Sequence, residues 1–339
     1  MTAILWGREN WIADRLVSEY FRHNPDTAVD FFAAVRTAED HASTEPEVIT
    51  MAKALTGGAI WIPMPWVLQG ATTGRLVEPI FEACRLTVTI HHIVPEKFFN
   101  EKSKIEIFKK LEPFVDTYHV TNKKTKETLE QVTNKNITLL PFWSNPDVWH
   151  PLQDRSALKE SLRISEDKFV IGSFQRDTEG SDLKSPKLEK GPDTFCDIIE
   201  KLYHTGKQGK EIQLVLAGYN RQYVINRLRE TCSNLEVLYF ERIPGQHLNA
   251  LYNCLDLYVV SSRIEGGPQA LVEASLARCP IVSTDVGIAT EILPPESIYS
   301  DADDFHLAVP NVEVAYKNAL KLAPDTDIFE KYKKMFYGS

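Results

Sequence analysis

Short apolar runs alternate with amphipathic segments along the whole chain. In the second half the apolar runs predict strands, and the segments between them show helical spacing of apolar residues. The strands are expected at 169–174, 212–218, 235–240, 256–262 and 280–284, and the helices at 192–204, 246–253 and 268–278. Strands that alternate with helices are typical of parallel α/β sheets, so this half predicts a Rossmann-like domain.

The first half shows the same alternation in a less regular form. Strands are expected at 3–6, 59–64, 86–90, 118–121 and 137–140, and helices at about 11–23 and 76–84. Ile105, Phe108 and Leu111 mark one face of a further helix. Asn24-Pro25 ends the first helix, because proline disfavours helical geometry at the residue before it. A second Rossmann-like domain is therefore predicted.

The segment 141–151, PFWSNPDVWHP, is rich in turn formers and predicts the boundary between the domains. Proline restricts its backbone, and Trp143 and Trp149 offer aromatic anchors to the two sides. We expect an N-terminal domain over 1–145 and a C-terminal domain over 146–322. The segment 323–339 is expected to contain a helix that packs back on the N-terminal domain. A length of 339 residues suits two domains.

Composition narrows the class of protein. The net charge of −9 argues against broad nucleic-acid binding. The five cysteines are widely spaced and form no CxxC, which favours buried free thiols in a reducing compartment. We find no signal peptide and no membrane span, so we expect a cytoplasmic protein. The lysines between 97 and 135 alternate with acids and predict a solvated surface, with peripheral membrane contact or an anionic-acceptor patch as the alternative.

The segment 261–274, SSRIEGGPQALVEA, carries the clearest chemistry. A buried strand ends here, two glycines follow, and Pro268 opens a helix whose free N–H groups and dipole suit a phosphate. Glu265 and Glu273 could each accept hydrogen bonds from a vicinal diol. On chemistry alone, a solvated loop acid and a helix acid explain the two glutamates equally well.

The spacing Glu265-x7-Glu273 in this strand, loop and helix resembles the donor site of the GT-B retaining glycosyltransferases of group 1 (glycosyltransferase family 4). The resemblance extends from Phe169 to about Leu293, through FERIPGQHLNALYNCLDLYVVSS upstream and ASLARCPIVSTDVGIATEIL downstream. It implies two Rossmann-like domains that face each other across a cleft. Gly267 departs from the family pattern, in which an aromatic residue is common at this position.

The resemblance also implies roles for individual residues. Glu273 would bind the donor ribose, Glu265 would face the transferred sugar, and Arg176 and Lys190 would neutralise the leaving diphosphate. The stretch between these two cations is longer than is usual in the family, so Lys184 or Lys187 could take the lysine's place. The other donor-binding residues would be Gly266, Gly267, Gln269, Ala270, Leu271 and, near the base, Ile243.

The first half resembles the family less. His91, after the strand at 86–90, matches a family histidine and would touch donor sugar or acceptor, although a lone histidine is more often structural. Thr121-Asn122 falls where the family often has a serine after a strand. Gly7 is the one weak candidate for a glycine-rich acceptor loop.

The resemblance implies transfer of a sugar, with retention, from a nucleotide-diphospho-sugar to an acceptor hydroxyl. The donor would be UDP- or GDP-linked, and the acceptor would be a carbohydrate, a lipid-linked group or a small molecule. No metal-binding motif stands out, so we expect no metal and no other cofactor. Two alternatives remain at this stage, a non-catalytic nucleotide-sugar binder and a GT-B sugar-nucleotide epimerase.

Overall fold

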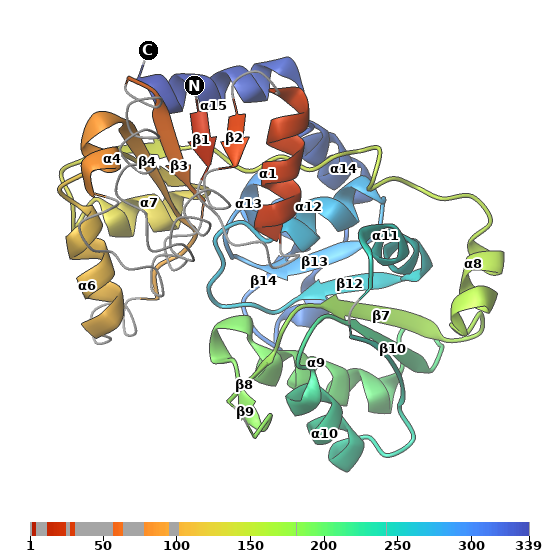
Figure 1. The fold of residues 1–339 in the computed structure, drawn as a ribbon. Helices are drawn as coiled ribbons and strands as arrows, with labels where there is room; N and C mark the ends of the chain where they lie inside the picture. The colour runs from red at the N-terminus through yellow and green to blue at the C-terminus, as the bar shows by residue number, and fades with distance from the viewer. Residues whose placement is uncertain are drawn as a thin grey trace, which may run out of the picture. The chain divides into compact units, whose positions relative to one another are not determined.

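The computed structural model describes residues 2–4, 12–24, 28–30, 57–63, 78–94, 102–180, 182–241 and 243–338 (Figure 1). The chain forms two compact units, Met1–Trp143 with Pro324–Ser339, and Ser144–Ala323. The second unit thus begins before the expected boundary after residue 145. The reason is that the backbone N–H of Ser144 donates to the Leu322 carbonyl at 2.9 Å and its Oγ donates to Gln269 Oε1 at 2.9 Å. Within the described segments, no helix combines the length and the apolar character that a membrane span requires.

The first unit contains a parallel six-stranded sheet in the order β2-β1-β3-β4-β5-β6. Its strands are β1 (Thr2–Ile4), β2 (Ala28–Asp30), β3 (Ala59–Ile62), β4 (Arg85–Ile90), β5 (Val115–Val120) and β6 (Asn136–Leu139). Its helices are α1 (Ile12–His23), α4 (Glu78–Ala83), α6 (Lys102–Leu111), α7 (Lys123–Leu129) and α15 (Thr326–Tyr337). Each strand and helix predicted for this half overlaps one of these elements, although residues 63, 84, 121 and 140 lie just beyond their ends. Residues 5, 6, 11, 64, 76 and 77 lie outside the described residues.

The terminal helix α15 packs into the first unit. Its buried face joins α1 and β3 in one apolar cluster that includes Tyr20, Trp61 and Trp143. The Trp143 ring centroid lies 5.0 Å from that of Phe329 and 4.9 Å from that of Tyr332, both on α15. Trp149, by contrast, is buried in the core of the second unit. The two tryptophans of the boundary segment therefore anchor it to different units, as the sequence predicts.

A series of hydrogen bonds links buried polar side chains in the first unit. Trp61 Nε1 donates to Thr89 Oγ1 at 2.8 Å, and Thr89 Oγ1 lies 2.9 Å from His119 Nδ1. His119 Nε2 lies 2.7 Å from the Leu140 carbonyl, so this nitrogen carries the proton and Nδ1 accepts from the threonine. Burial lowers the pKa of His119 to about 4, against the backbone hydrogen bond to Leu140, which raises it. His119 is therefore neutral near pH 7.

The second unit contains a parallel six-stranded sheet in the order β11-β10-β7-β12-β13-β14. Its strands are β7 (Phe169–Phe174), β10 (Ile212–Ala217), β11 (Glu236–Phe240), β12 (Leu257–Val260), β13 (Ile281–Thr284) and β14 (Ile298–Tyr299). A separate antiparallel hairpin joins β8 (Thr178–Glu179) to β9 (Ser185–Pro186). The five strands predicted for this half all lie in the six-stranded sheet.

Helices cover both faces of this sheet. They are α8 (Arg155–Leu162), α9 (Pro192–Thr205), α10 (Gln222–Thr231), α11 (Gly245–Cys254), α12 (Gln269–Leu276), α13 (Ala289–Ile292) and α14 (Val312–Leu320). Short 3-10 turns follow at η2 (Leu188–Lys190), η3 (Pro295–Ser297) and η4 (Phe305–Leu307). Every residue of β7 is buried, with Phe169 and Ile171 in the core that includes α9 and α10 and Val170 and Phe174 in the core that includes α11 and α12. A strand buried on both faces reads as a continuous apolar run, which explains why FVIGSF was recognisable.

All five cysteines are buried free thiols, as expected from their spacing.

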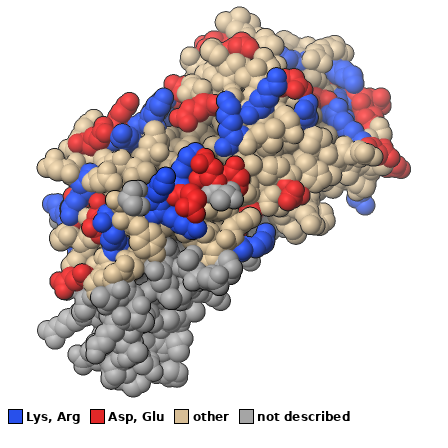
Figure 2. Space-filling model, turned by 90° about the horizontal axis from the view of Figure 1, so that it is seen from above, with Lys and Arg blue, Asp and Glu red and all other residues tan. Residues whose placement is uncertain are grey.

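On the described part of the face shown in Figure 2, basic and acidic side chains are interspersed rather than separated.

Candidate donor-binding site

The loop between β12 and α12 holds Glu265 in a partly enclosed position. The carboxylate side chain is 13% exposed, and its Oε1 accepts hydrogen bonds from Lys190 Nζ at 2.5 Å and from Ser262 Oγ at 2.9 Å. Pro268 caps the start of α12 without a side-chain hydrogen bond. Because the sheet is parallel, this loop and the one after β7 lie at the same edge of the sheet. The structure therefore brings together two residues that the sequence had selected separately.

Gly191 explains why Lys190 reaches the β12 loop. Its φ is +58°, and a Cβ at this position would lie 1.8 Å from the Ser261 carbonyl oxygen. Only glycine permits this approach without a shift of the backbone. The contact is reinforced at Lys190, whose carbonyl accepts from Gln175 Nε2 at 3.0 Å and from Ser261 Oγ at 3.3 Å. The Lys-Gly pair is thus held directly against the end of β12.

Gly287 supports the Glu265 loop from another side. Its φ is +56°, and a Cβ there would lie 2.7 Å from Pro268 Cδ and 3.2 Å from the Gly266 carbonyl oxygen. Gly266 is buried, whereas Gly267 is only partly buried. The turn after β13 therefore limits how far the loop can move before α12 begins.

Glu273 lies in the second turn of α12 and is only 4% exposed. Tyr252 OH donates to Glu273 Oε2 at 3.2 Å. Burial, followed by the neighbouring Tyr258 and Glu273, raises the pKa of Tyr252 well above its usual value, so the phenol keeps its proton. A buried carboxylate needs such donors, because an unsatisfied charge in a protein interior is costly. Glu273 is therefore a buried helix acid held by Tyr252, and its role at the donor stays a prediction.

Three further cations lie near Lys190 in sequence. Arg176 is exposed, and its Nε donates to the Thr178 carbonyl at 3.1 Å. Lys184 is exposed on the β8–β9 hairpin. Lys187 is partly buried: burial lowers the pKa of its ammonium group, as does Lys190, while Glu189 opposes the change. Arg176 also lowers this pKa and Glu265 raises it, so the ammonium group of Lys187 responds to charges of both signs.

The other predicted donor residues lie on or near the same helix. Gln269 is the first residue of α12 and accepts from Ser144, while Leu271 is fully buried. Ala270 and Ile243 are partly buried and pack against the same core. Leu271, Ala270 and Ile243 thus supply apolar packing, and their side chains offer no polar group to a ligand.

His91 follows β4 in the first unit. Its Nε2 lies 2.7 Å from the Pro63 carbonyl, and its ring centroid lies 5.5 Å from that of Phe142. Burial lowers the pKa of His91 to about 4, so the ring is neutral near pH 7. Asn122 instead caps α7, because its Oδ1 accepts from the Thr125 N–H at 2.8 Å. Gly7 lies outside the described residues, and a shared site between His91 and Glu265 stays a prediction.

The sequence reading missed a buried ion pair between Asp177 and Arg221, whose side chains are both 0% exposed. Arg221 also donates to the Ala217 carbonyl at 3.1 Å and to Ser173 Oγ at 3.2 Å. The pair thereby joins the ends of β7 and β10 at the edge where Arg176 lies. No local pattern distinguishes these two residues, and the position of Asp177 directly after Arg176 is the one signal that could have drawn attention to it.

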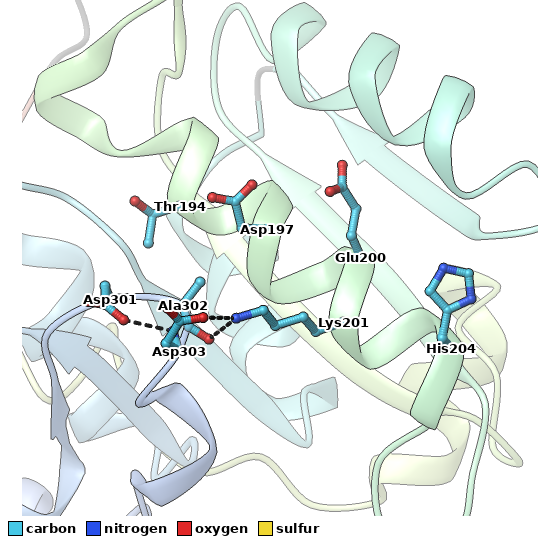
Figure 3. A pocket seen from close by; sticks show the side chains of 8 residues that line it. All are labelled: Thr194, Asp197, Glu200, Lys201, His204, Asp301, Ala302 and Asp303. Carbon is cyan, nitrogen blue, oxygen red and sulfur yellow. Dashed lines mark hydrogen bonds and ion pairs between the residues drawn. The ribbon is translucent and has the colours of Figure 1, made fainter.

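A pocket of about 580 Å³ lies along α9 (Figure 3). Its lining includes the acids Asp197, Glu200, Asp301 and Asp303, and Lys201 is paired with Asp303. None of the predicted donor residues lines it. Its negative charge is unfavourable for a diphosphate. Within the described residues, no group of three or more His, Cys, Asp or Glu side chains could hold a metal ion.

Comparison with known proteins connects this geometry to a family. Residues 183–321 match the family model described as Glycosyl transferases group 1. HepE of Anabaena, solved with UDP and glucose, is similar with a TM-score of 0.74 and 14% identity, over 100% of this chain and 99% of that one. No curated protein sequence matches.

Two other solved structures are similar. Sucrose-phosphate synthase from Thermosynechococcus elongatus has a TM-score of 0.62 and 16% identity, over 87% of this chain and 79% of that one. A glycosyltransferase from Rickettsia africae has a TM-score of 0.66 and 13% identity, over 99% and 97%. At this identity the similarity shows the fold. Residues 183–321 therefore match the group 1 glycosyltransferase model, in a chain that has the GT-B fold.

Proposed function

We propose that this protein is a retaining hexosyltransferase that moves a sugar from a nucleotide-diphospho-sugar to an acceptor hydroxyl without a metal ion. The observation that carries the proposal is the contact between Lys190 and Glu265 beside the start of α12, with Glu273 buried one turn further on. Cation, reacting-centre carboxylate and ribose carboxylate thus come from one edge of one sheet. UDP is the first nucleotide to test, because the similar Anabaena structure contains it, and GDP is the second.

In this proposal each residue acts at a separate part of the donor. Glu273 accepts hydrogen bonds from the ribose hydroxyls. Arg176 and Lys190 stabilise the charge that develops on the leaving diphosphate. Free N–H groups of Gly266, Gly267 and the first turn of α12 bind sugar hydroxyls and phosphate.

The reacting centre involves Glu265 and the acceptor. Glu265 stabilises positive charge that grows on the sugar ring as the bond to the diphosphate breaks. A phosphate oxygen of the donor takes the acceptor proton, so the new bond forms on the face from which the diphosphate leaves. His91 of the first unit, neutral near pH 7, contacts the sugar or the acceptor by hydrogen bonding rather than as a cation. The reaction takes place in the cytoplasm, where the acceptor is a carbohydrate, a lipid-linked group or a small molecule.

The test is a turnover assay with UDP-, GDP- and ADP-linked hexoses and a pool of acceptors. We expect one donor to release its nucleoside diphosphate faster when acceptor is added, and the product to keep the anomeric configuration of the donor by NMR. Excess EDTA should leave the rate unchanged, because Arg176 and Lys190 supply the positive charge that a metal would otherwise provide.

Two results would contradict the proposal. An epimerised nucleotide sugar formed without acceptor would indicate a different reaction on the same fold. A rate that EDTA abolishes and Mg²⁺ restores would show that the cations of the chain are insufficient.

A further inference from the structure

The β8–β9 hairpin carries Lys187 to the edge of the sheet where Lys190 and Glu265 meet. The backbone of Lys187 is fixed on both sides: its N–H donates to the Asp177 carbonyl at 2.8 Å, and its carbonyl accepts from the Lys190 N–H at 2.8 Å. Lys187 stands between β9 and the 3-10 turn η2 that ends at Lys190. Its position is therefore set by the fold and not by a free loop.

The anchor of this segment is itself rigid. Asp177, whose carbonyl holds Lys187, forms the fully buried ion pair with Arg221. Thr178 Oγ1 donates to Asp177 Oδ1 at 2.7 Å and accepts from the Tyr223 N–H at 2.9 Å. A buried ion pair is costly to form and costly to break, so its role here is to hold the backbone in one arrangement. The start of the hairpin is thus bound to the loop after β10.

The charges around Lys187 are unbalanced. Among the described residues, Lys190 is the member of the trio Arg176, Lys187 and Lys190 that has a carboxylate within 4.0 Å, namely Glu265. Lys187 is partly buried; burial, Lys190 and Arg176 disfavour its charged form, while Glu189 and Glu265 favour it. Cations gathered in this way repel each other unless an anion binds among them. Arg176 and Lys187 thus add two positive charges beside the Lys190–Glu265 pair, and such charges complement a diphosphate.

We propose that Lys187 is a third cation of the donor site and binds the diphosphate directly, alongside Arg176 and Lys190. This assignment rests on the proposed function. It resolves the choice that the sequence leaves open among three lysines. Glu265 partly offsets the positive charge of Lys190, and Lys187 supplies a further positive charge to the diphosphate. Lys184 is exposed, and its backbone N–H donates to Asp182 Oδ1 at 3.1 Å within the hairpin turn. In this proposal Lys184 does not bind the diphosphate.

The test compares Lys187→Gln with Lys184→Gln, a lysine from the same hairpin. Titration calorimetry would use UDP, UMP and uridine, with the guanine series in parallel. We expect Lys187→Gln to weaken binding of the nucleoside diphosphate about tenfold, because one charge-assisted contact is lost. The nucleoside should bind as it does to the wild type, and the binding of the diphosphate should depend less on salt. Lys187→Arg should restore most of the affinity, and Lys184→Gln should change it less than about twofold.

Each contrary result has one meaning. If the wild type binds a nucleoside diphosphate and Lys187→Gln behaves like Lys184→Gln, the role of Lys187 is overturned while the proposed function stands. If Lys187→Gln weakens diphosphate and nucleoside equally, the residue is merely structural and the inference is again overturned. If the wild type binds no nucleoside diphosphate in either series, the proposed function fails and the inference fails with it.

Discussion

Replacing Glu265 with glutamine is expected to lower sugar transfer by about 100-fold or more, while nucleoside diphosphate binding changes only a few-fold. Glutamine has the shape of glutamate, and its amide oxygen can still accept from Ser262 and Lys190 as Glu265 does at 2.9 Å and 2.5 Å. The negative charge beside the reacting sugar is lost. Removing one preorganised electrostatic contact to a transition state typically costs about 10²–10³ in rate.

The matched control is Glu313→Gln. Glu313 also pairs with a cation, Arg278, but its side chain is 60% exposed. Exposed ion pairs contribute little to stability. Neither Arg278 nor Glu313 is one of the predicted donor-binding residues. Rates of transfer and of donor hydrolysis should therefore match the wild type in Glu313→Gln. Retention of a third or more of wild-type turnover by Glu265→Gln would remove Glu265 from the reacting centre.

The first unit is expected to lose stability as the pH falls from about 6.5 toward 4. His119 has a pKa of about 4 in the folded chain and an ordinary value of 6.5, so between these values the unfolded state binds more protons. The contribution of neutral His119 is fully present above pH 6.5 and is lost progressively below it. One pKa unit corresponds to about 1.4 kcal/mol, so the loss near pH 4 is about 3 kcal/mol. His91, with a folded pKa also of about 4, adds a loss of the same sign.

Urea denaturation at several pH values, followed by tryptophan fluorescence, measures this effect. Trp61 and Trp143 lie in the same apolar cluster as Tyr332, whose ring packs against that of His119. Their fluorescence therefore reports on the surroundings of His119. The variant His119→Gln removes the titrating group, so its free energy of unfolding should fall less steeply with acid than that of the wild type. The exposed His306 provides the control, since His306→Gln should keep the wild-type slope. Equal slopes in the wild type and His119→Gln would show that His119 is not buried in its neutral form.

The sequence predicts the buried strands of the second unit well, for a physical reason. Strands such as β7 and β10 are buried on both faces and appear as nearly continuous apolar runs, so the sequence indicates where they begin and end. Polar helices lack this signal: α7, α8 and α10 were not predicted, and α8 begins after Asp154, which has a left-handed backbone. The β8–β9 hairpin was visible in the sequence only as extra length between Arg176 and Lys190.

Within the candidate site, the residues of a continuous motif were predictable and the contacts between motifs were not. Glu265 and Glu273 belong to one strand, loop and helix, whose pattern is local. Lys190 and Glu265 are 75 residues apart, and their contact depends on the close approach of Gly191 to Ser261. Asp177 and Arg221, 44 residues apart, leave no local pattern beyond the position of Asp177 directly after Arg176. Long-range burial decides both pairs, and no spacing in the sequence encodes it.

The most direct test of the donor site in the second unit is calorimetric titration of the wild type and Glu273→Gln with UDP, GDP and ADP. Glutamine preserves the bulk of the buried side chain and an acceptor for Tyr252, but it offers the ribose one acceptor oxygen in place of a carboxylate. We predict that one nucleoside diphosphate binds the wild type and binds Glu273→Gln at least about tenfold more weakly, with both proteins folded by circular dichroism. Equal affinity in the two proteins, or no binding of any of the three nucleotides to the wild type, would contradict this placement of the site.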